Sequence, residues 1–215
     1  MTLFLSVFAL AIGQYAYAKT PISIRFNAGA INYPLLEWFN FVGDVDSSVY
    51  KKDNVNPYVS LACYYGLSSK HSVFIGTEYL RTNASLYSNC NNVEENITWE
   101  FKATPINIGY EYKLVKNKTS LCPIFTIGAA YFISELYGEA YSTPAIFPPE
   151  KATRTGNGYG FFGSVGIQKQ ITESFCGSVN FRARYSDGMY FTDDKEDIDV
   201  EFTSFDLNFG IGWIF

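Results

Sequence analysis

Strict alternation of apolar and polar residues over the last eleven positions constrains this chain more than any other feature. The apolar set is Phe205, Leu207, Phe209, Ile211, Trp213 and Phe215, and the intervening set is Asp206, Asn208, Gly210 and Gly212. Successive side chains of an extended strand point to opposite faces, so this segment has one wide aromatic face and one small polar face. A soluble protein would turn the apolar face inward, whereas a membrane-spanning strand would turn it toward lipid.

The same period of two recurs along most of the chain. Turn signals separate eight alternating segments, which cover residues 22–32, 57–67, 72–83, 97–114, 121–135, 158–171, 175–185 and 200–215. Their polar faces combine charged side chains with glycines, which leave space for long side chains inside a narrow barrel. The sequence therefore predicts an all-β fold, a transmembrane antiparallel up-and-down β-barrel of about eight strands.

The connections between these segments alternate in length. Residues 68–71, 115–120 and 172–174 form short connections, and those after the first, third, fifth and seventh segments are long and polar. Short periplasmic turns and long extracellular loops are typical of outer-membrane barrels. An even number of strands also places both ends of the barrel chain at the short-turn end.

The N-terminal segment differs from the rest of the chain. An apolar stretch over residues 3–13 is followed by Ala16-Tyr17-Ala18, a small-x-small cleavage site before Lys19. We therefore expect a secretory signal peptide over residues 1–18 and one barrel domain over residues 19–215. The basic residues that usually precede the apolar stretch are missing, because no lysine or arginine comes before Lys19.

Charge and composition narrow the classes of function. A net charge of -5 and a pI near 4.9 offer no basic surface for nucleic acid. Aromatic residues make up 18% of the chain, as expected for a barrel with aromatic girdles at both membrane interfaces. After the N-terminal segment no apolar run approaches the roughly 20 residues of a membrane helix. Any membrane crossing must therefore use closed strands, whose backbone groups pair with one another.

One register fault interrupts the fourth segment. Trp99, Phe101 and Ala103 are odd-numbered, whereas the apolar residues from Ile106 onward are even-numbered. The apolar face is therefore predicted to flip near Pro105. A β-bulge would explain the flip, since proline cannot donate a hydrogen bond to the ladder.

The four cysteines, Cys63, Cys90, Cys122 and Cys176, follow no metal-binding spacing. Cys122 and Cys176 share inward parity but lie two strands apart, about 10 Å by strand spacing, which exceeds the reach of a disulfide. We interpret the cysteines as small apolar residues whose disulfide state stays open, and we expect no metal site and no cofactor.

Seven charged residues fall on the predicted inner faces: Arg25, Glu78, Glu111, Lys113, Arg182, Arg184 and Asp206. Counting residues from the periplasmic ends places Glu78, Arg182 and Asp206 at similar heights, with Arg25 and Glu111 lower. An unpaired buried charge is costly, so these side chains should form ion pairs. A filled, ion-paired lumen is one hypothesis, and a small polar or ion pathway is the alternative.

Acidic residues concentrate just before the last segment, at Asp193, Asp194, Glu196, Asp197, Asp199 and Glu201. Asp193, Asp194, Asp197 and Asp199 form a candidate loop for a divalent cation that would bridge to lipopolysaccharide phosphates. A solvated acidic loop is the alternative.

The aromatic residues near the predicted strand ends are Tyr33, Trp38, Tyr58, Trp99, Tyr137, Tyr159 and Tyr190. They fit girdle and loop packing, or a glycan-binding surface. Enzymatic barrels need a group such as His with Ser near the outer rim, whereas His71 lies in a short periplasmic turn. We therefore expect no catalytic residues and no enzymatic activity.

Several segments resemble the OmpA/OmpX-like small outer-membrane β-barrel proteins. They are Gly76-Thr-Glu-Tyr79, Thr104-Pro-Ile-Asn-Ile-Gly-Tyr-Glu-Tyr-Lys113, Pro123-Ile-Phe-Thr-Ile-Gly-Ala-Ala-Tyr131 and the C-terminal strand ending in Trp213-Ile-Phe215. The likeness is diffuse and covers essentially the whole mature chain. It implies an eight-stranded barrel of Gram-negative outer membranes. It also implies that Phe209, Trp213 and Phe215 belong to a sorting signal read by the barrel-assembly machinery.

The family implies no single activity, so the fold does not define a function. We expect a monomeric, integral protein of the cell outer membrane with a structural or adhesion-like role. Its expected partners are outer-membrane lipid and lipopolysaccharide, and an extracellular ligand bound by the loops. The alternatives are a small-solute or hydrophobic-compound channel and a lipid-modifying enzyme. A soluble lipocalin-like barrel is the rival fold, and it would need an apolar lumen and a polar outside.

Overall fold

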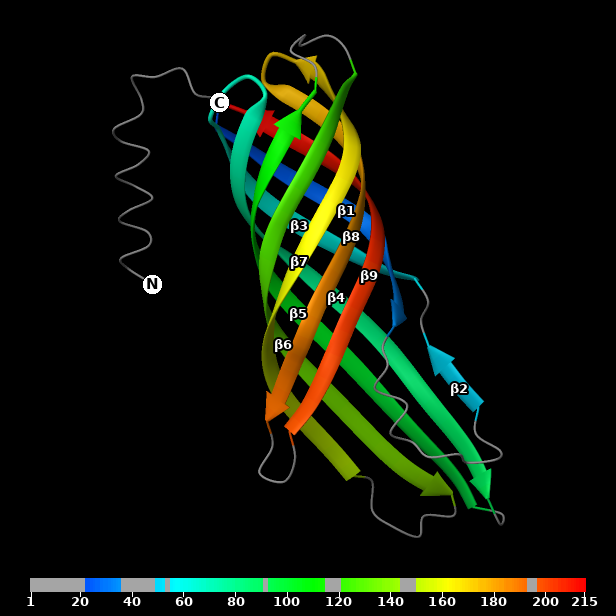
Figure 1. The fold of residues 1–215 in the computed structure, drawn as a ribbon. Coiled ribbons are helices and arrows are strands. Elements are labelled where there is room, and N and C mark those ends of the chain that lie inside the picture. The colour runs from blue at the N-terminus through cyan, green and yellow to red at the C-terminus, as the bar shows by residue number, and fades with distance from the viewer. Residues whose placement is uncertain are drawn as a thin grey trace.

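Eight long antiparallel strands close into one barrel (Figure 1). The computed structural model describes residues 22–35, 49–52, 55–90, 93–114, 121–143, 150–192 and 197–215. The strands in these ranges are β1 (Ile22–Leu35), β2 (Val49–Lys52), β3 (Val55–Gly66), β4 (His71–Cys90), β5 (Val93–Lys113), β6 (Cys122–Thr143), β7 (Glu150–Thr172), β8 (Phe175–Thr192) and β9 (Asp197–Ile214). These ranges contain no helix that is long and apolar enough to span a bilayer. Residues 1–18, the expected signal peptide, lie outside them.

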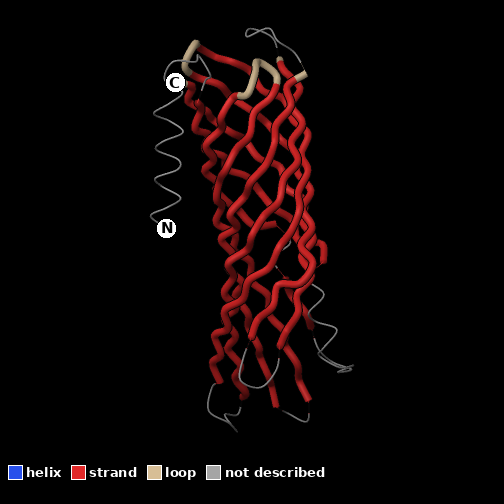
Figure 2. The backbone as a smooth tube through the Cα atoms, turned by 60° about the vertical axis from the view of Figure 1, so that its left-hand side comes forward, coloured by secondary structure: helices blue, strands red, loops and turns tan. Residues whose placement is uncertain are grey.

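The barrel is closed by pairing between its first and last strands. β1 pairs with β3 on one side and with β9 on the other, from Ser23 opposite Ile214 to Asn32 opposite Phe205. Pairing of β4 with β5 completes the circuit. Figure 2 shows the resulting tube of tilted strands. The short β2 is an addition that the sequence analysis did not anticipate, and among the described strands it pairs with β4 alone.

The outer face of the barrel is apolar, as the alternation predicts. In β9, Phe209 and Trp213 are more than half exposed, as is Phe215 just after it, whereas Asp206 and Asn208 are buried. Exposed isoleucine, leucine, valine and aromatic side chains recur on the outward positions of the other long strands. A soluble lipocalin-like barrel would have a polar outside, so this arrangement rejects the rival fold.

The apolar outer face has a defined limit toward the end of the barrel opposite the short turns. On β4 the outward apolar series ends at Tyr79, and the next outward residue is Arg81. On β6 it ends at Ile133, which is followed by Glu135. Charged residues directly beyond the last outward apolar residues indicate that the strands leave the hydrocarbon region at this level.

The strands continue well past this border. β4, β5, β6 and β7 contain 20, 21, 22 and 23 residues, about twice the 9–11 residues of a strand that crosses a bilayer. The connections between β4 and β5, β6 and β7, and β8 and β9 comprise residues 91–92, 144–149 and 193–196. The prediction of long loops after the third, fifth and seventh segments is therefore wrong. Polar residues such as Asn83 and Glu100 pair across the ladder instead, which satisfies their backbone groups.

The predicted bulge at Pro105 is also wrong. The β5–β6 ladder runs without a register shift from Glu94 opposite Thr143 to Lys113 opposite Ile124. Phe101, Ala103 and Pro105 all point inward, in phase with the residues that follow. The apparent flip arose because this strand changes the character of its inward face from apolar to polar while its register continues.

Candidate functional site

The small inner faces of the strands bring all seven sequence-predicted charged residues into the lumen. They form two clusters, Arg25 with Glu111 and Lys113, and Glu78 with Arg182, Arg184 and Asp206. All of them project from inward positions of the alternating strands. Side chains from opposite walls can meet, because an eight-stranded barrel is narrow.

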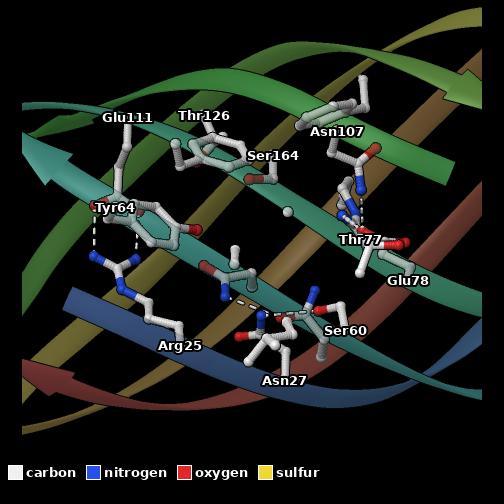
Figure 3. Close-up of a pocket in the computed structure, with 18 residues that line it drawn as sticks. Arg25, Asn27, Ser60, Tyr64, Thr77, Glu78, Asn107, Glu111, Thr126 and Ser164 are labelled. Atoms are coloured by element: carbon white, nitrogen blue, oxygen red, sulfur yellow. Dashed lines mark hydrogen bonds and ion pairs between the residues drawn. The ribbon is translucent and has the colours of Figure 1, made fainter. Parts of the chain in front are cut away.

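The cluster nearer the short turns connects opposite walls of the barrel. Arg25 of β1 donates two hydrogen bonds to Glu111 of β5, from Nη1 to Oε2 at 2.5 Å and from Nη2 to Oε1 at 2.8 Å (Figure 3). The two side chains are only 3% and 1% exposed. The Arg25 guanidinium lies over the Tyr64 ring at 3.8 Å, and Lys113 Nζ approaches Glu111 at 3.7 Å. A planar, bidentate pair of this kind fixes the two walls in one geometry.

The second cluster balances two cations against two anions. Arg182 contacts Glu78 at 2.5 Å and Asp206 at 2.9 Å, and Arg184 contacts the same two carboxylates at 2.6 and 3.0 Å. Tyr58 donates its hydroxyl proton to Asp206 at 2.5 Å and accepts a hydrogen bond from Arg182 at 2.9 Å. Tyr58 was expected among the rim aromatics, and the structure places it inside the lumen instead, 3% exposed. The sequence signal for this position was that Tyr58 shares the inward parity of Ser60 and Ala62.

Amide and hydroxyl side chains occupy the level between the clusters. Asn27 donates to Ser60 at 3.0 Å, Asn180 donates to Asn208 at 3.0 Å, and Asn107 donates to Glu78 at 2.9 Å. They surround a cavity of about 50 Å³ that both clusters border (Figure 3). This volume holds a few water molecules and no larger solute.

The lumen also contains a buried apolar cluster, which the sequence analysis did not anticipate. The buried core cluster consists of Ile31, Tyr58, Ala62, Phe74, Leu80, Phe101, Ala103, Ala130, Phe132, Leu136 and Phe162. Ile31, Leu80, Phe101 and Phe132 are essentially inaccessible to solvent. Their inward parity was the signal in the sequence, but the assumed flip at Pro105 assigned Phe101 to the outside. Apolar side chains therefore fill the lumen alongside the ion pairs: Ala62, Phe74 and Phe162 border the cavity between the charged clusters.

The remaining candidates are distributed over other parts of the molecule. Asp193 and Asp194 lie outside the described residues, whereas Asp197 and Asp199 belong to β9 and not to a loop. Within the described ranges no group of histidine, cysteine and acidic side chains is arranged to hold a metal ion. No disulfide joins Cys63, Cys122 and Cys176, the cysteines whose side chains are described.

Among the predicted rim aromatics, Trp99 packs against the apolar core cluster, and Tyr159 is 70% exposed on the outer wall. The side chains of Tyr33, Trp38 and Tyr190 lie outside the described set. His71 begins β4 at the short-turn end and contacts the hydroxyl of Tyr110 on the outer wall.

A closed antiparallel barrel with a lipid-facing apolar wall and a filled polar and apolar lumen is an integral outer-membrane β-barrel. Solved structures of similar fold come from this class. OprG from Pseudomonas aeruginosa matches with a TM-score of 0.53 and 12% identity, over 91% of this chain and 96% of that one. Neisserial surface protein A matches with a TM-score of 0.45 and 12% identity, over 91% and 97%. Ail from Yersinia pestis matches with a TM-score of 0.43 and 15% identity, over 91% and 97%.

No model of a known protein family matches the sequence. No curated protein sequence matches it either. At identities this low the structural likeness concerns the fold alone.

Proposed function

We propose that this protein is a non-conducting outer-membrane barrel that acts structurally or through its surface, in an adhesion-like role. The sealed lumen carries this proposal. Two ion-paired clusters and an apolar layer follow one another along the axis, and the space between the clusters is only about 50 Å³. A pathway for solutes would have to break both clusters and hydrate the apolar layer.

Conductance of the purified protein in planar lipid bilayers tests the proposal. We expect no conductance steps from protein whose folded state is verified by its heat-dependent gel shift. Regular, reproducible steps from the same folded preparation would refute it.

A small-solute channel is the second candidate, and the polar cavity between the clusters favours it. The Glu78→Gln variant separates the two functions, because Glu78 contacts both Arg182 and Arg184. In a closed barrel this variant lowers stability and stays silent, whereas in a channel it raises single-channel conductance. A variant with unchanged stability and unchanged conductance would contradict both functions.

We also infer that the protein has no enzymatic activity. The sequence contains one histidine, His71, which lies at the short-turn end and not at the opposite rim. A lipid-modifying enzyme would need its acyl-transfer group near the outer leaflet. Incubation of the folded protein with radiolabelled lipopolysaccharide tests this inference, and release or transfer of an acyl chain would refute it.

The expected partners are those that would meet the outer wall of the barrel. We propose that Phe209, Trp213 and Phe215, all exposed at the C-terminal end of the chain, serve the barrel-assembly machinery during insertion. Lipopolysaccharide would then surround the wall of the monomeric barrel at the end opposite the short turns. The diffuse resemblance to OmpA/OmpX-like barrels supports these roles at the level of the family pattern.

A further inference from the structure

The outer wall of β4, β5 and β6 changes chemistry where the strands leave the bilayer. Arg81 lies opposite Lys102 in the ladder, Asn83 lies opposite Glu100, and Ser85 lies opposite Thr98. On the other side of β5, Glu100 lies opposite Tyr137 of β6. These residues alternate with inward-facing ones, so they form a continuous polar patch that begins directly beyond Tyr79.

This patch is hollowed into a pocket of about 390 Å³. Its outward-facing lining is Arg81, Asn83, Ser85, Thr98, Glu100 and Tyr137. The volume falls in the range of about 300–1,000 Å³ that is typical of small-molecule sites. Figure 1 shows that β4, β5 and β6 reach beyond the ends of β8 and β9 in this part of the sheet.

The charges of the patch are already matched by one another. Glu100 pairs with Arg81 and, at 3.2 Å, with Lys102. Glu139, next to the pocket on β6, pairs with Lys151 at 3.1 Å and accepts a hydrogen bond from Tyr137 at 3.3 Å. A charged ligand would have to displace one of these ion-pair partners. The pocket therefore does not favour a ligand by ionic attraction.

The groups that line the pocket instead suit a ligand rich in hydroxyl groups. A paired guanidinium and carboxylate, an amide and two hydroxyls offer donors and acceptors side by side. Hydrogen bonds to the charged members of such a set are the stronger ones. The Tyr137 ring supplies an apolar surface with a polar tip, which suits the mixed faces of a sugar ring.

We propose that this pocket binds a neutral saccharide of about one or two sugar units. The inference rests on the proposed surface role, because it requires this wall to stand outside the bilayer. Two sources supply the same chemistry: neutral sugars of the lipopolysaccharide core around the barrel, and a soluble glycan at the cell surface. The outward-facing lining lies on the outer wall just beyond Tyr79, so both can reach it.

Saturation-transfer NMR on the folded protein in phosphatidylcholine nanodiscs tests the proposal. The soluble probes are lactose and N-acetylglucosamine, and the membrane-derived probe is deacylated and dephosphorylated lipopolysaccharide core oligosaccharide. The variants Tyr137→Ala and Thr98→Ala remove pocket groups. Tyr141→Ala is the matched control, since Tyr141 is an exposed tyrosine on the same strand and the same wall but does not line the pocket.

We expect transfer to at least one probe, at least a fivefold loss of affinity in Tyr137→Ala and Thr98→Ala, and wild-type binding in Tyr141→Ala. Transfer to the core oligosaccharide alone assigns the lipopolysaccharide source, and transfer to a soluble sugar assigns the other. Absence of transfer to every probe, or an equal loss in Tyr141→Ala, overturns the proposal.

If the barrel is silent in bilayers but binds no sugar, only the pocket is refuted. If it conducts and still binds, only the closed lumen is refuted.

Discussion

The two halves of the lumen fill the same narrow space with different chemistry. Toward the short turns, Arg25 and Glu111 bridge opposite walls by a bidentate ion pair. Toward the other end, Leu80, Phe101 and Phe132 fill the space with apolar side chains. An ion-paired layer depends on each partner, because removal of one leaves a buried charge, whereas an apolar layer loses only packing. The difference predicts which substitutions the barrel tolerates.

The largest expected effect comes from removing a carboxylate that two cations share. Asp206→Asn leaves Arg182 and Arg184 with Glu78 as their only carboxylate within 4 Å among the ion pairs described above. We expect the free energy of unfolding to fall by about 3–5 kcal/mol. Urea titration in lipid vesicles, followed by the heat-dependent gel shift, measures it.

Glu135→Gln is the control for this prediction, since Glu135 is an exposed carboxylate on the outer wall. It should leave the free energy of unfolding nearly unchanged. If Asp206→Asn behaves like this control, the cluster does not hold the barrel together.

A smaller effect is expected in the apolar half. Leu80 is fully buried, so Leu80→Ala removes apolar contacts and leaves a cavity. The expected loss is about 3 kcal/mol by the same urea titration. The variant should remain silent in planar bilayers, because a cavity lined by apolar groups stays dry. Conductance in this variant would show that the apolar layer alone seals the lumen.

Joint replacement of an ion pair sharpens the comparison further. Glu111→Leu alone leaves the buried Arg25 guanidinium without its carboxylate and should lower the free energy of unfolding by several kcal/mol. Adding Arg25→Met to the same chain replaces the pair by apolar groups of similar size. The double variant should recover most of the loss and lie within about 1–2 kcal/mol of the wild type. A double variant that unfolds as easily as the single one would mean that the charges themselves specify the fold.

The smallest effect belongs to an ion pair outside the bilayer. Lys151 is 60% exposed and contacts Glu139 at 3.1 Å. The hydrogen bond to Glu139 raises the pKa of Lys151. Because solvent screens exposed pairs, Lys151→Ala should give no measurable change in the urea midpoint. A clear shift would show that the protruding wall is coupled to the membrane-embedded part.

Much of the fold could be predicted from local patterns. The parity of Asp206 and Phe209 in β9 identified the inward and outward faces, and the same parity placed Arg25, Glu78 and Arg182 in the lumen. The hydroxyl of Tyr58 and the ring of Phe101 were assigned to the wrong side, because an aromatic residue fits both a girdle and a core. The lengths of β4–β7 were underestimated, since polar residues in a strand outside the bilayer resemble a loop in composition.

The alternation of the sequence by itself determined a closed barrel with lipid outside, because the side-chain period of a strand assigns every residue to one of two faces. Which inward residues meet was decided only by the tertiary structure. Arg25 and Glu111 are 86 positions apart, and their contact depends on the closure and stagger of all the strands between them. The same stagger decided which inward charges meet and which inward apolar side chains pack together.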